Sequence, residues 1–352
     1  SYNFQNWYPS VEYETTNTTK NVGLFDLTPF SKFEIKSEKA HQELQRICTA
    51  NIKNEIGKCT YTHMLNSDGG IETDLTIVCI DKDHFRIISS AATRERDKFH
   101  INKYLSKDIV LRDVTDNYCV FGLFGPKSRD LIQSISKDNF DNDTFKFGSA
   151  KNILVGGIKI WAQRLSYVGE LGYELYVSFD DAKKIYELLI EKGKDFNLSN
   201  CGMHALDIMR MESGFLHWGH DISPEENQYQ AGLTFTISKK KDKNFIGKES
   251  LDKIKKEKIN SRFAMFTLKD SKPGEPLLLH DEPIYLDDKI IGRSTSGNYS
   301  FNFKKNLSFG YIDTDFSNEE LKNKNLFIEV EKKKYSISIL LKPLKQSNFK
   351  NI

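Results

Sequence analysis

The chain has 352 residues, with 51 lysine and arginine residues against 49 aspartate and glutamate residues, so its formal net charge is only +2. This balance argues against a nucleic-acid-binding protein, which usually carries a basic excess. Its apolar runs are far shorter than the roughly 20 residues that span a bilayer, and its first residues, SYNF, do not resemble a signal peptide. We therefore expect a cytoplasmic protein of two or more subdomains that binds neither nucleic acid nor membrane.

Cysteine and glycine patterns exclude further classes of site. The five cysteines are scattered and contain no Cys-x-x-Cys pair, so we expect reduced thiols and neither a disulfide framework nor a zinc site. The chain also lacks the Gly-x-Gly-x-x-Gly and Gly-x-x-x-x-Gly-Lys-Ser/Thr loops. We therefore expect no FAD, NAD or ATP site of these usual types.

The N-terminal part begins with a polar segment. Residues 1–20 include the run TTNTT and are expected to form an extended lead-in. Residues 33–35 alternate inward and outward as a strand does, and Ser37 can cap a helix over 38–48. Further helices are predicted at three places: 92–105, after the Gly-Pro step at 125–126, and 180–194.

Residues 65–75, which read LNSDGGIETDL, lie between two predicted strands. The central SDGG has the composition of a hairpin turn, because glycine supplies the positive φ angles that tight turns need. Asp74 therefore stands where the chain enters a buried strand. A carboxylate there is either hydrogen-bonded for a structural reason or serves a function, and a turn-supporting aspartate is the plainer interpretation.

A second turn with acidic residues covers 164–175, which read RLSYVGELGYEL. A strand enters the Gly-x-x-Gly turn, and apolar residues at period two continue on its other side. Glu170 lies in this turn, where an acidic side chain is usually solvated. The residues alone therefore favour a surface position for Glu170.

A helix is predicted over 201–214, which read CGMHALDIMRMESG. Its apolar residues share one face at helical spacing, while Asp207 and Arg210, three residues apart, can pair on another face. The plain interpretation is an internal ion pair that orders the helix.

Residues 217–221 read HWGHD and raise the question of a metal site. Two histidines three residues apart, with an aspartate, could hold a metal ion. No second cluster of ligands supports such a site, so we expect none.

The C-terminal part becomes strand-rich from about residue 262. Strands are predicted over 262–268, 283–293 with a turn at 287–288, 307–312, and a hairpin over 326–340. This spacing predicts a small C-terminal β-barrel.

These phrases, in this order, resemble the aminomethyltransferase (glycine-cleavage T-protein) family. The resemblance is closest to the C-terminal folate-binding half of dimethylglycine and sarcosine dehydrogenases, and it extends from about residue 6 to residue 340. It implies an α+β fold of mixed sheets and helices in a compact disc of several subdomains. We expect a folate-binding aminomethyltransferase-like domain over 1–255, with two α+β subdomains that divide near 145–155, and a β-barrel domain over 256–352.

The resemblance implies the roles of five residues. Asp74 would be the catalytic residue, placed beside the reactive nitrogens of tetrahydrofolate, the implied cofactor. Glu170 would bind the pterin, because one carboxylate can accept hydrogen bonds from a ring N–H and the adjacent amine. Tyr167, Arg210 and Tyr61 would complete the cofactor-binding site.

Two places depart from the family pattern. Glu72 and Thr73 stand where the T-proteins commonly have another residue and an aspartate, so a paired-carboxylate mechanism is not expected. Leu206 replaces a family arginine, as in dimethylglycine dehydrogenase-like sequences, and the consequence for folate contact is open.

The expected function is that of an aminomethyltransferase-like one-carbon transferase. It would form 5,10-methylenetetrahydrofolate from a methylated-amine or aminomethyl donor, with a lipoyl carrier protein or a flavin dehydrogenase as the candidate protein partner. One alternative is a folate-dependent demethylase of a small sulfonium or ammonium compound that gives 5-methyltetrahydrofolate. The others are a non-catalytic folate-binding protein and a subunit of a split flavin dehydrogenase.

Overall fold

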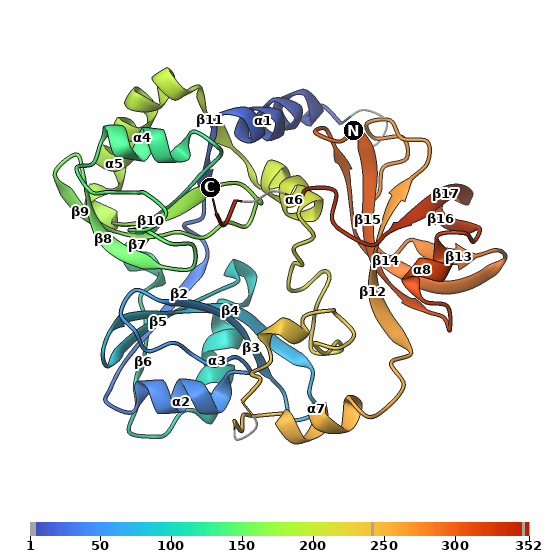
Figure 1. Cartoon of the computed structure of the whole chain (residues 1–352), viewed down its shortest axis with the longest axis horizontal. Helices are drawn as coiled ribbons and strands as arrows, with labels where there is room; N and C mark the ends of the chain where they lie inside the picture. The colour runs from blue at the N-terminus through green and yellow to red at the C-terminus, as the bar shows by residue number, and fades with distance from the viewer. Residues whose placement is uncertain (1–4, 241–242, 347–348, 352) are drawn as a thin grey trace.

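The computed structural model describes residues 5–240, 243–346 and 349–351, and Figure 1 shows its sheets arranged around a common centre. A six-stranded sheet and a five-stranded sheet lie on one side, and a closed six-stranded barrel lies on the other. Helix α6, Met203–Glu212, lies between them. The predicted α+β fold with a C-terminal β-barrel is confirmed.

The six-stranded sheet combines strands from distant parts of the chain. Among the strand pairs that the structure describes in it, β1 and β11 are parallel and the others are antiparallel. In spatial order the strands are β11 Leu198–Cys201, β1 Val22–Asp26, β7 Tyr118–Phe124, β10 Gly172–Ser178, β9 Ile158–Gln163 and β8 Ala150–Val155.

The five-stranded sheet is antiparallel throughout. In spatial order its strands are β3 Cys59–Leu65, β4 Ile71–Asp81, β5 His84–Ser89, β2 Ser31–Lys36 and β6 Leu111–Asp113. The hairpin between β3 and β4 is the one predicted around the SDGG turn.

The barrel closes through antiparallel pairing of β12 with both β15 and β17. Around the barrel the strands are β12 Ser261–Leu268, β15 Lys305–Asp313, β14 Lys289–Ser300, β13 Pro283–Leu286, β16 Leu326–Val330 and β17 Lys333–Leu340. The strand pattern read from the sequence is thus confirmed, including the turn at 287–288 between β13 and β14.

Each open sheet carries two helices on one face, and the two sheets meet through part of their other faces. Helices α2 Ala40–Ile47 and α3 Arg94–Tyr104 pack on the five-stranded sheet through one apolar cluster. Helices α4 Ser128–Ser134 and α5 Phe179–Gly193 pack on the six-stranded sheet through another. A separate cluster contains Val78 of β4 together with Trp161 and Tyr176 of β9 and β10, so the remaining faces meet. Because strand side chains alternate between faces, each sheet can send polar side chains into this contact.

The helical predictions hold except at the N-terminus. Helix α2 lies within the predicted 38–48, and α3 and α5 match the predicted 92–105 and 180–194. The expected extended lead-in over 1–20 is wrong for its described part, because Tyr8–Lys20 forms helix α1. The structure also contains two short helices, α7 Lys248–Ile254 and α8 Asn318–Leu321.

Packing explains why α1 forms despite its threonines. Val11, Thr15 and Thr18 are buried on one face of the helix. The hydroxyl of Thr15 donates to the carbonyl of Val11 (2.9 Å), and that of Thr18 donates to the carbonyl of Glu14 (2.8 Å). Burial of one face therefore outweighs the weak helix propensity of the sequence.

The domain boundaries remain a prediction. Strand β8 lies within the expected division near 145–155, and β7 before it and β9 after it belong to the same sheet. Of the helices that the structure describes, none is long and apolar enough to cross a membrane.

Candidate functional site

Asp74 is positioned by the hairpin that joins β3 to β4. The side-chain oxygen of Asn66 accepts hydrogen bonds from the backbone N–H of Asp68 (3.0 Å) and Gly70 (2.9 Å) and so fixes the turn. A Cβ atom at Gly70 would lie 1.8 Å from the carbonyl oxygen of Pro224, so only glycine fits there. The strand then carries Asp74 to the face that meets the six-stranded sheet.

The carboxyl group of Asp74 is strongly perturbed. Its side chain is 18% exposed, and burial raises its pKa to about 7, although a hydrogen bond with Tyr61 lowers it. Within the described part of the chain, its Oδ1 atom is buried and has no hydrogen-bond partner. The group is therefore present in both protonation states near neutral pH, with one oxygen available to a ligand.

His63 lies beside Asp74, and the sequence analysis missed it. It is the cross-strand partner of Asp74, and its Nε2 atom lies 3.8 Å from Asp74 Oδ1 and 3.3 Å from the Tyr61 hydroxyl. Burial lowers the pKa of His63 to about 3, so the ring is neutral. Its Nδ1 atom lies 3.0 Å from the hydroxyl of Thr236. Strand register, which the sequence did not reveal, is the signal that would have found it.

Glu170 is buried and is paired with a lysine from the C-terminal segment. Lys345 forms an ion pair with Glu170, and the backbone N–H of Lys345 donates to the carbonyl of Glu212 (2.8 Å). The same segment carries Phe349, which packs against Phe215 with 6.3 Å between ring centroids. The predicted surface position of Glu170 is wrong. The side chain is buried, because Lys345, 175 positions later in the chain, lies against it.

Glu174, in the same motif, lies on the inward face of β10. It accepts a hydrogen bond from the hydroxyl of Tyr176 (3.0 Å), and burial raises its pKa to about 7. Glu174 also raises the pKa of Cys59 on β3, after the larger effect of burial, so it lies near the five-stranded sheet. Its cross-strand neighbour Gln163 is fully buried, and neither polar atom of that amide has a partner among the described residues.

Period two along β10 could have identified Glu174. Tyr173 and Leu175 enter the apolar cluster under α4 and α5, so Glu174 must point to the opposite face. The sequence analysis instead chose the first of the two glutamates in the motif.

Arg210 is the centre of a buried polar network. Its guanidinium donates to Asp221 (2.5 Å), Asp207 (2.7 Å), Ser296 (2.8 Å) and the carbonyl of Phe215 (3.1 Å). The predicted pairing of Arg210 with Asp207 on the helix is therefore present. With four of its five N–H donors bonded to the protein, Arg210 is better suited to hold elements together than to bind a cofactor directly.

Tyr167 lies next to this network and to Asp74. Its ring stacks on Phe215 at 6.0 Å between centroids, and its hydroxyl donates to the carbonyl of Leu216 (2.9 Å). Its pKa is raised, mainly by burial, and among nearby charges Arg210 lowers it while Asp74 raises it. The structure thus brings Asp74, Tyr61 and Tyr167 together, whereas Glu170 pairs with Lys345.

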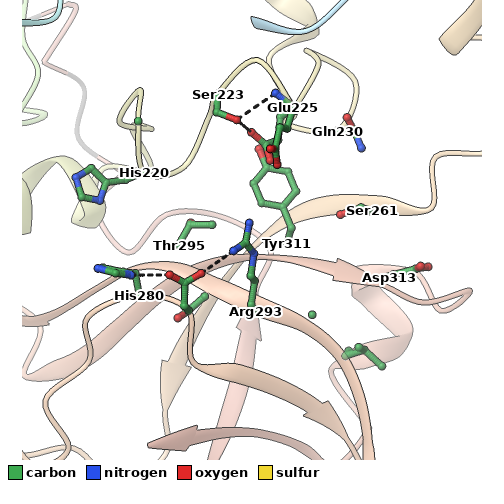
Figure 2. Close-up of a pocket in the computed structure, with 16 residues that line it drawn as sticks. His220, Ser223, Glu225, Gln230, Ser261, His280, Arg293, Thr295, Tyr311 and Asp313 are labelled. Atoms are coloured by element: carbon green, nitrogen blue, oxygen red, sulfur yellow. Dashed lines mark hydrogen bonds and ion pairs between the residues drawn. The ribbon is translucent and has the colours of Figure 1, made fainter. Parts of the chain in front are cut away.

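The HWGHD segment and the barrel border a polar pocket of about 590 Å³ (Figure 2). Asp221 of this segment is already engaged by Arg210 and by the hydroxyls of Thr295 (2.6 Å) and Ser296 (2.8 Å). On the barrel side, Asp281 accepts a hydrogen bond from Arg293 at 2.7 Å. Among the residues described, no group of three or more His, Cys, Asp or Glu side chains could hold a metal ion.

Two family models together match most of the chain. Residues 1–241 match the model described as GCVT N-terminal domain. Residues 262–345 match the model described as glycine cleavage T-protein C-terminal barrel domain.

Individual relatives differ in length. The mitochondrial dimethylglycine dehydrogenase of Rattus norvegicus is 31% identical over 348 residues, which are 98% of this chain and 40% of the relative. The aminomethyltransferase of Halothermothrix orenii is 32% identical over 319 residues, which are 89% of this chain and 87% of the relative. The 4-methylaminobutanoate oxidase (formaldehyde-forming) of Paenarthrobacter nicotinovorans is 35% identical over 316 residues, which are 90% of this chain and 38% of the relative. The chain thus spans about two fifths of the length of the dehydrogenase and the oxidase.

One solved structure supports the fold. The crystal structure of glycine cleavage system aminomethyltransferase T from Bartonella henselae superposes with a TM-score of 0.83 at 20% identity. It covers 96% of this chain and 90% of that chain. At this identity the likeness establishes the fold alone.

Replacing Arg210 tests the buried network. Arg210→Met leaves Asp221 buried without its cation, so we expect the free energy of unfolding to fall by about 3–5 kcal/mol in urea titrations. Arg293→Met, which removes an exposed pair, should cost less than about 1 kcal/mol. Equal losses in the two variants would show that the network has no special structural role.

Replacing Asp74 tests its pKa. Between pH 4 and pH 7 the folded chain keeps a proton on Asp74 that the unfolded chain loses, so this group lowers stability as pH rises. Asp74→Asn should therefore raise the free energy of unfolding at pH 8 by roughly 1–3 kcal/mol, and the gain should vanish near pH 4. Asp68→Asn, on the exposed turn of the same hairpin, is the control. A pH-independent difference would contradict the raised pKa.

Proposed function

We propose that this chain, which belongs to the glycine cleavage T-protein family, is a tetrahydrofolate-dependent one-carbon transferase. It would form 5,10-methylenetetrahydrofolate from a methylated-amine or aminomethyl donor. The observation that carries the proposal is Asp74, a buried carboxyl group with its pKa raised to about 7 and one oxygen without a partner in the described chain. Perturbed carboxyl groups of this kind are concentrated at functional sites.

Two polar groups on the face of the six-stranded sheet that meets the five-stranded sheet fit the hydrogen-bonding edges of a reduced pterin. One edge presents a ring N–H beside an amine, which a carboxylate accepts with both oxygens. Other edges of the pterin present a ring N–H close to a hydrogen-bond acceptor. An amide side chain matches such an edge, because its oxygen accepts from the N–H and its nitrogen donates to the acceptor. Glu174 and the unpartnered amide of Gln163 are cross-strand neighbours and supply these two kinds of group.

Glu174 is a better candidate than Glu170 for the pterin amine. Lys345 already neutralises Glu170. Glu174 lies on the face that meets the five-stranded sheet, and the described residue that hydrogen-bonds it is the neutral Tyr176. We therefore assign Glu170 to the anchoring of the C-terminal segment, and we propose Glu174 as the pterin-binding carboxylate. Tyr167, stacked on Phe215, would form a wall of the same site.

Asp74 would act through its charge. Tetrahydrofolate, when bound, supplies nitrogen nucleophiles that accept a one-carbon unit at the oxidation level of formaldehyde. An ionised Asp74 would orient these nitrogens and stabilise the positive charge that develops nearby, and a fixed charge in a buried site does so effectively. Neutral His63 packs behind the carboxylate without neutralising it.

The donor and the protein partner are proposals that rest on relatives. The name of the rat relative, dimethylglycine dehydrogenase, favours an N-methylated amine as the source of the one-carbon unit. A flavin dehydrogenase domain or subunit would then be the partner. The aminomethyltransferase relative favours an aminomethyl group on a lipoyl carrier instead.

Turnover of an Asp74 variant tests the catalytic role. Asp74→Asn should abolish turnover while tetrahydrofolate still binds, and wild-type turnover should increase as pH rises through about 7, because the ionised form is required. Product mass is the measurement, with an aminomethyl-lipoyl compound as the donor in one assay. In the other, the donor is a methylated amine supplied together with a flavin dehydrogenase that carries out its two-electron oxidation. The mass also separates 5,10-methylenetetrahydrofolate from the 5-methyl product of a demethylase. Unchanged turnover in Asp74→Asn would refute the role.

Binding to two glutamate variants tests the pterin site. Glu174→Gln should weaken tetrahydrofolate binding about 10- to 100-fold in calorimetric titrations, because charge-assisted hydrogen bonds are lost. Glu170→Gln should weaken it less than about threefold. If Glu170→Gln weakens binding more than Glu174→Gln does, Glu170 is the pterin-binding residue, as the sequence implied. If neither substitution changes the affinity, the pterin does not bind at this site.

A further inference from the structure

The pocket of about 590 Å³ between the HWGHD segment and the barrel has no role in the proposed function. One side of it is the loop over 219–230, and the other side is formed by barrel residues, chiefly from β14 and β15. Figure 2 shows these two sides facing each other. A volume of this size is typical of sites that bind small molecules.

The lining of this pocket is acidic. It contains four carboxyl groups and one guanidinium, that of Arg293. Asp281 accepts a hydrogen bond from this guanidinium (2.7 Å), so the positive charge is already neutralised. Among the residues that the structure describes, the other three carboxyl groups form no ion pair; they belong to Glu225, Glu226 and Asp313. The pocket therefore favours a cation over an anion.

The fold holds Glu226 in position. Its carboxylate accepts a hydrogen bond from the hydroxyl of Ser223 (2.6 Å), and the same hydroxyl accepts one from the backbone N–H of Glu225 (3.1 Å). The backbone carbonyl of Glu226 accepts from the N–H of Ile71 (2.9 Å), which ties the loop to strand β4. A carboxylate that is already oriented loses little freedom when it binds a ligand.

Tyr311 gives a second, independent indication of a ligand. It is only 8% exposed, and its hydroxyl is buried without a hydrogen-bond partner in the described part of the chain. Burial raises the pKa of Tyr311, and the charges of Glu226 and Asp221 raise it further, so the hydroxyl is neutral and lies near both carboxylates. Figure 2 shows the ring extending from the barrel toward the loop that carries Ser223 and Glu225. A buried hydroxyl of this kind is costly unless a ligand bonds to it.

The arrangement of acceptors indicates what the ligand must donate. Asp221 is already committed to Arg210 and to hydroxyl groups of the barrel. Glu226 bonds only to Ser223 and keeps further acceptor capacity, and the hydroxyl oxygen of Tyr311 can accept as well. A cation with at least two N–H groups can donate to both oxygens at once. A quaternary ammonium ion has no N–H group and cannot.

We propose that this pocket binds a small organic ammonium ion whose N–H groups donate to the carboxylate of Glu226 and to the hydroxyl oxygen of Tyr311. The carbon substituent of the ion would occupy the remaining volume. A coordinated metal ion suits the pocket less well, because the described residues contain no group of three or more His, Cys, Asp or Glu side chains that could hold one. The inference does not depend on the proposed function, since no folate contact enters it.

The test compares two cations with the same charge and the same alkyl chain. The whole chain is titrated by calorimetry at low salt with butylammonium and with butyltrimethylammonium, which has no N–H group. Wild type should bind butylammonium about tenfold more tightly, because only this ion forms charge-assisted hydrogen bonds. Added salt should weaken the binding of both ions.

Variants assign the binding to the pocket. Glu226→Gln should weaken butylammonium binding about tenfold, and Tyr311→Phe about threefold to tenfold. Tyr311→Phe should not lower the free energy of unfolding in urea titrations, because the hydroxyl has no partner to lose in the described chain. Glu257→Gln, which removes one charge from an exposed residue outside the pocket, is the control and should leave binding unchanged.

Several outcomes would overturn the inference. Equal affinity of wild type for the two ions would show attraction by net charge and no built site. An equal loss of affinity in Glu257→Gln would show the same. Unchanged binding in both Glu226→Gln and Tyr311→Phe would place the ion elsewhere. Displacement of butylammonium by equimolar Mg²⁺ would identify the pocket as a metal site. None of these titrations contains folate, so their failure would leave the proposed function standing.

Discussion

The structure around the site depends on one buried guanidinium. Arg210 projects from α6 and is held by Asp221, Asp207 and Ser296, so it ties the central helix to the segment after it and to strand β14 of the barrel. A buried charge must be compensated, and this requirement fixes the position of each partner. Arg210 also binds the carbonyl of Phe215, whose ring stacks on Tyr167. The network therefore positions Phe215 and Tyr167, the residue that we propose as one wall of the site.

The contact between the two open sheets places carboxyl groups in the protein interior. Each sheet covers one face with helices and turns its other face to the neighbouring sheet. Asp74 and Glu174 both occupy inward positions of these faces, and burial raises the pKa of each to about 7. Such groups lower the stability of the fold when ionised, which is the usual cost of a functional site. A ligand that offers hydrogen-bond donors relieves that cost.

Local features could be read from the sequence, and distant contacts could not. The SDGG turn, the barrel strands and helices α2, α3 and α5 follow from periodicity and turn composition, which act over a few residues. Helix α1 was missed because its threonine-rich face is stabilised by burial. The pairing of Arg210 with Asp207 is local and was predicted, whereas Asp221 becomes its partner only through folding.

The choice between two glutamates shows the same limit. Glu170 and Glu174 stand in one motif, and either could bind an amine. Lys345, which neutralises Glu170, comes from the far end of the chain. His63 was missed for a related reason, because only the register of β3 on β4 places it opposite Asp74. The tertiary contacts were therefore needed before we could propose a role for either glutamate.

The most direct test of this account is a crystal structure of the chain grown with 5-formyltetrahydrofolate, a stable reduced folate. We expect the heterocycle between β4 and β10, with Glu174 on its amine edge, Asp74 beside its reactive nitrogens and Arg210 still bound to Asp221. A folate bound away from these two strands, or seated on Glu170 with Lys345 displaced, would contradict it.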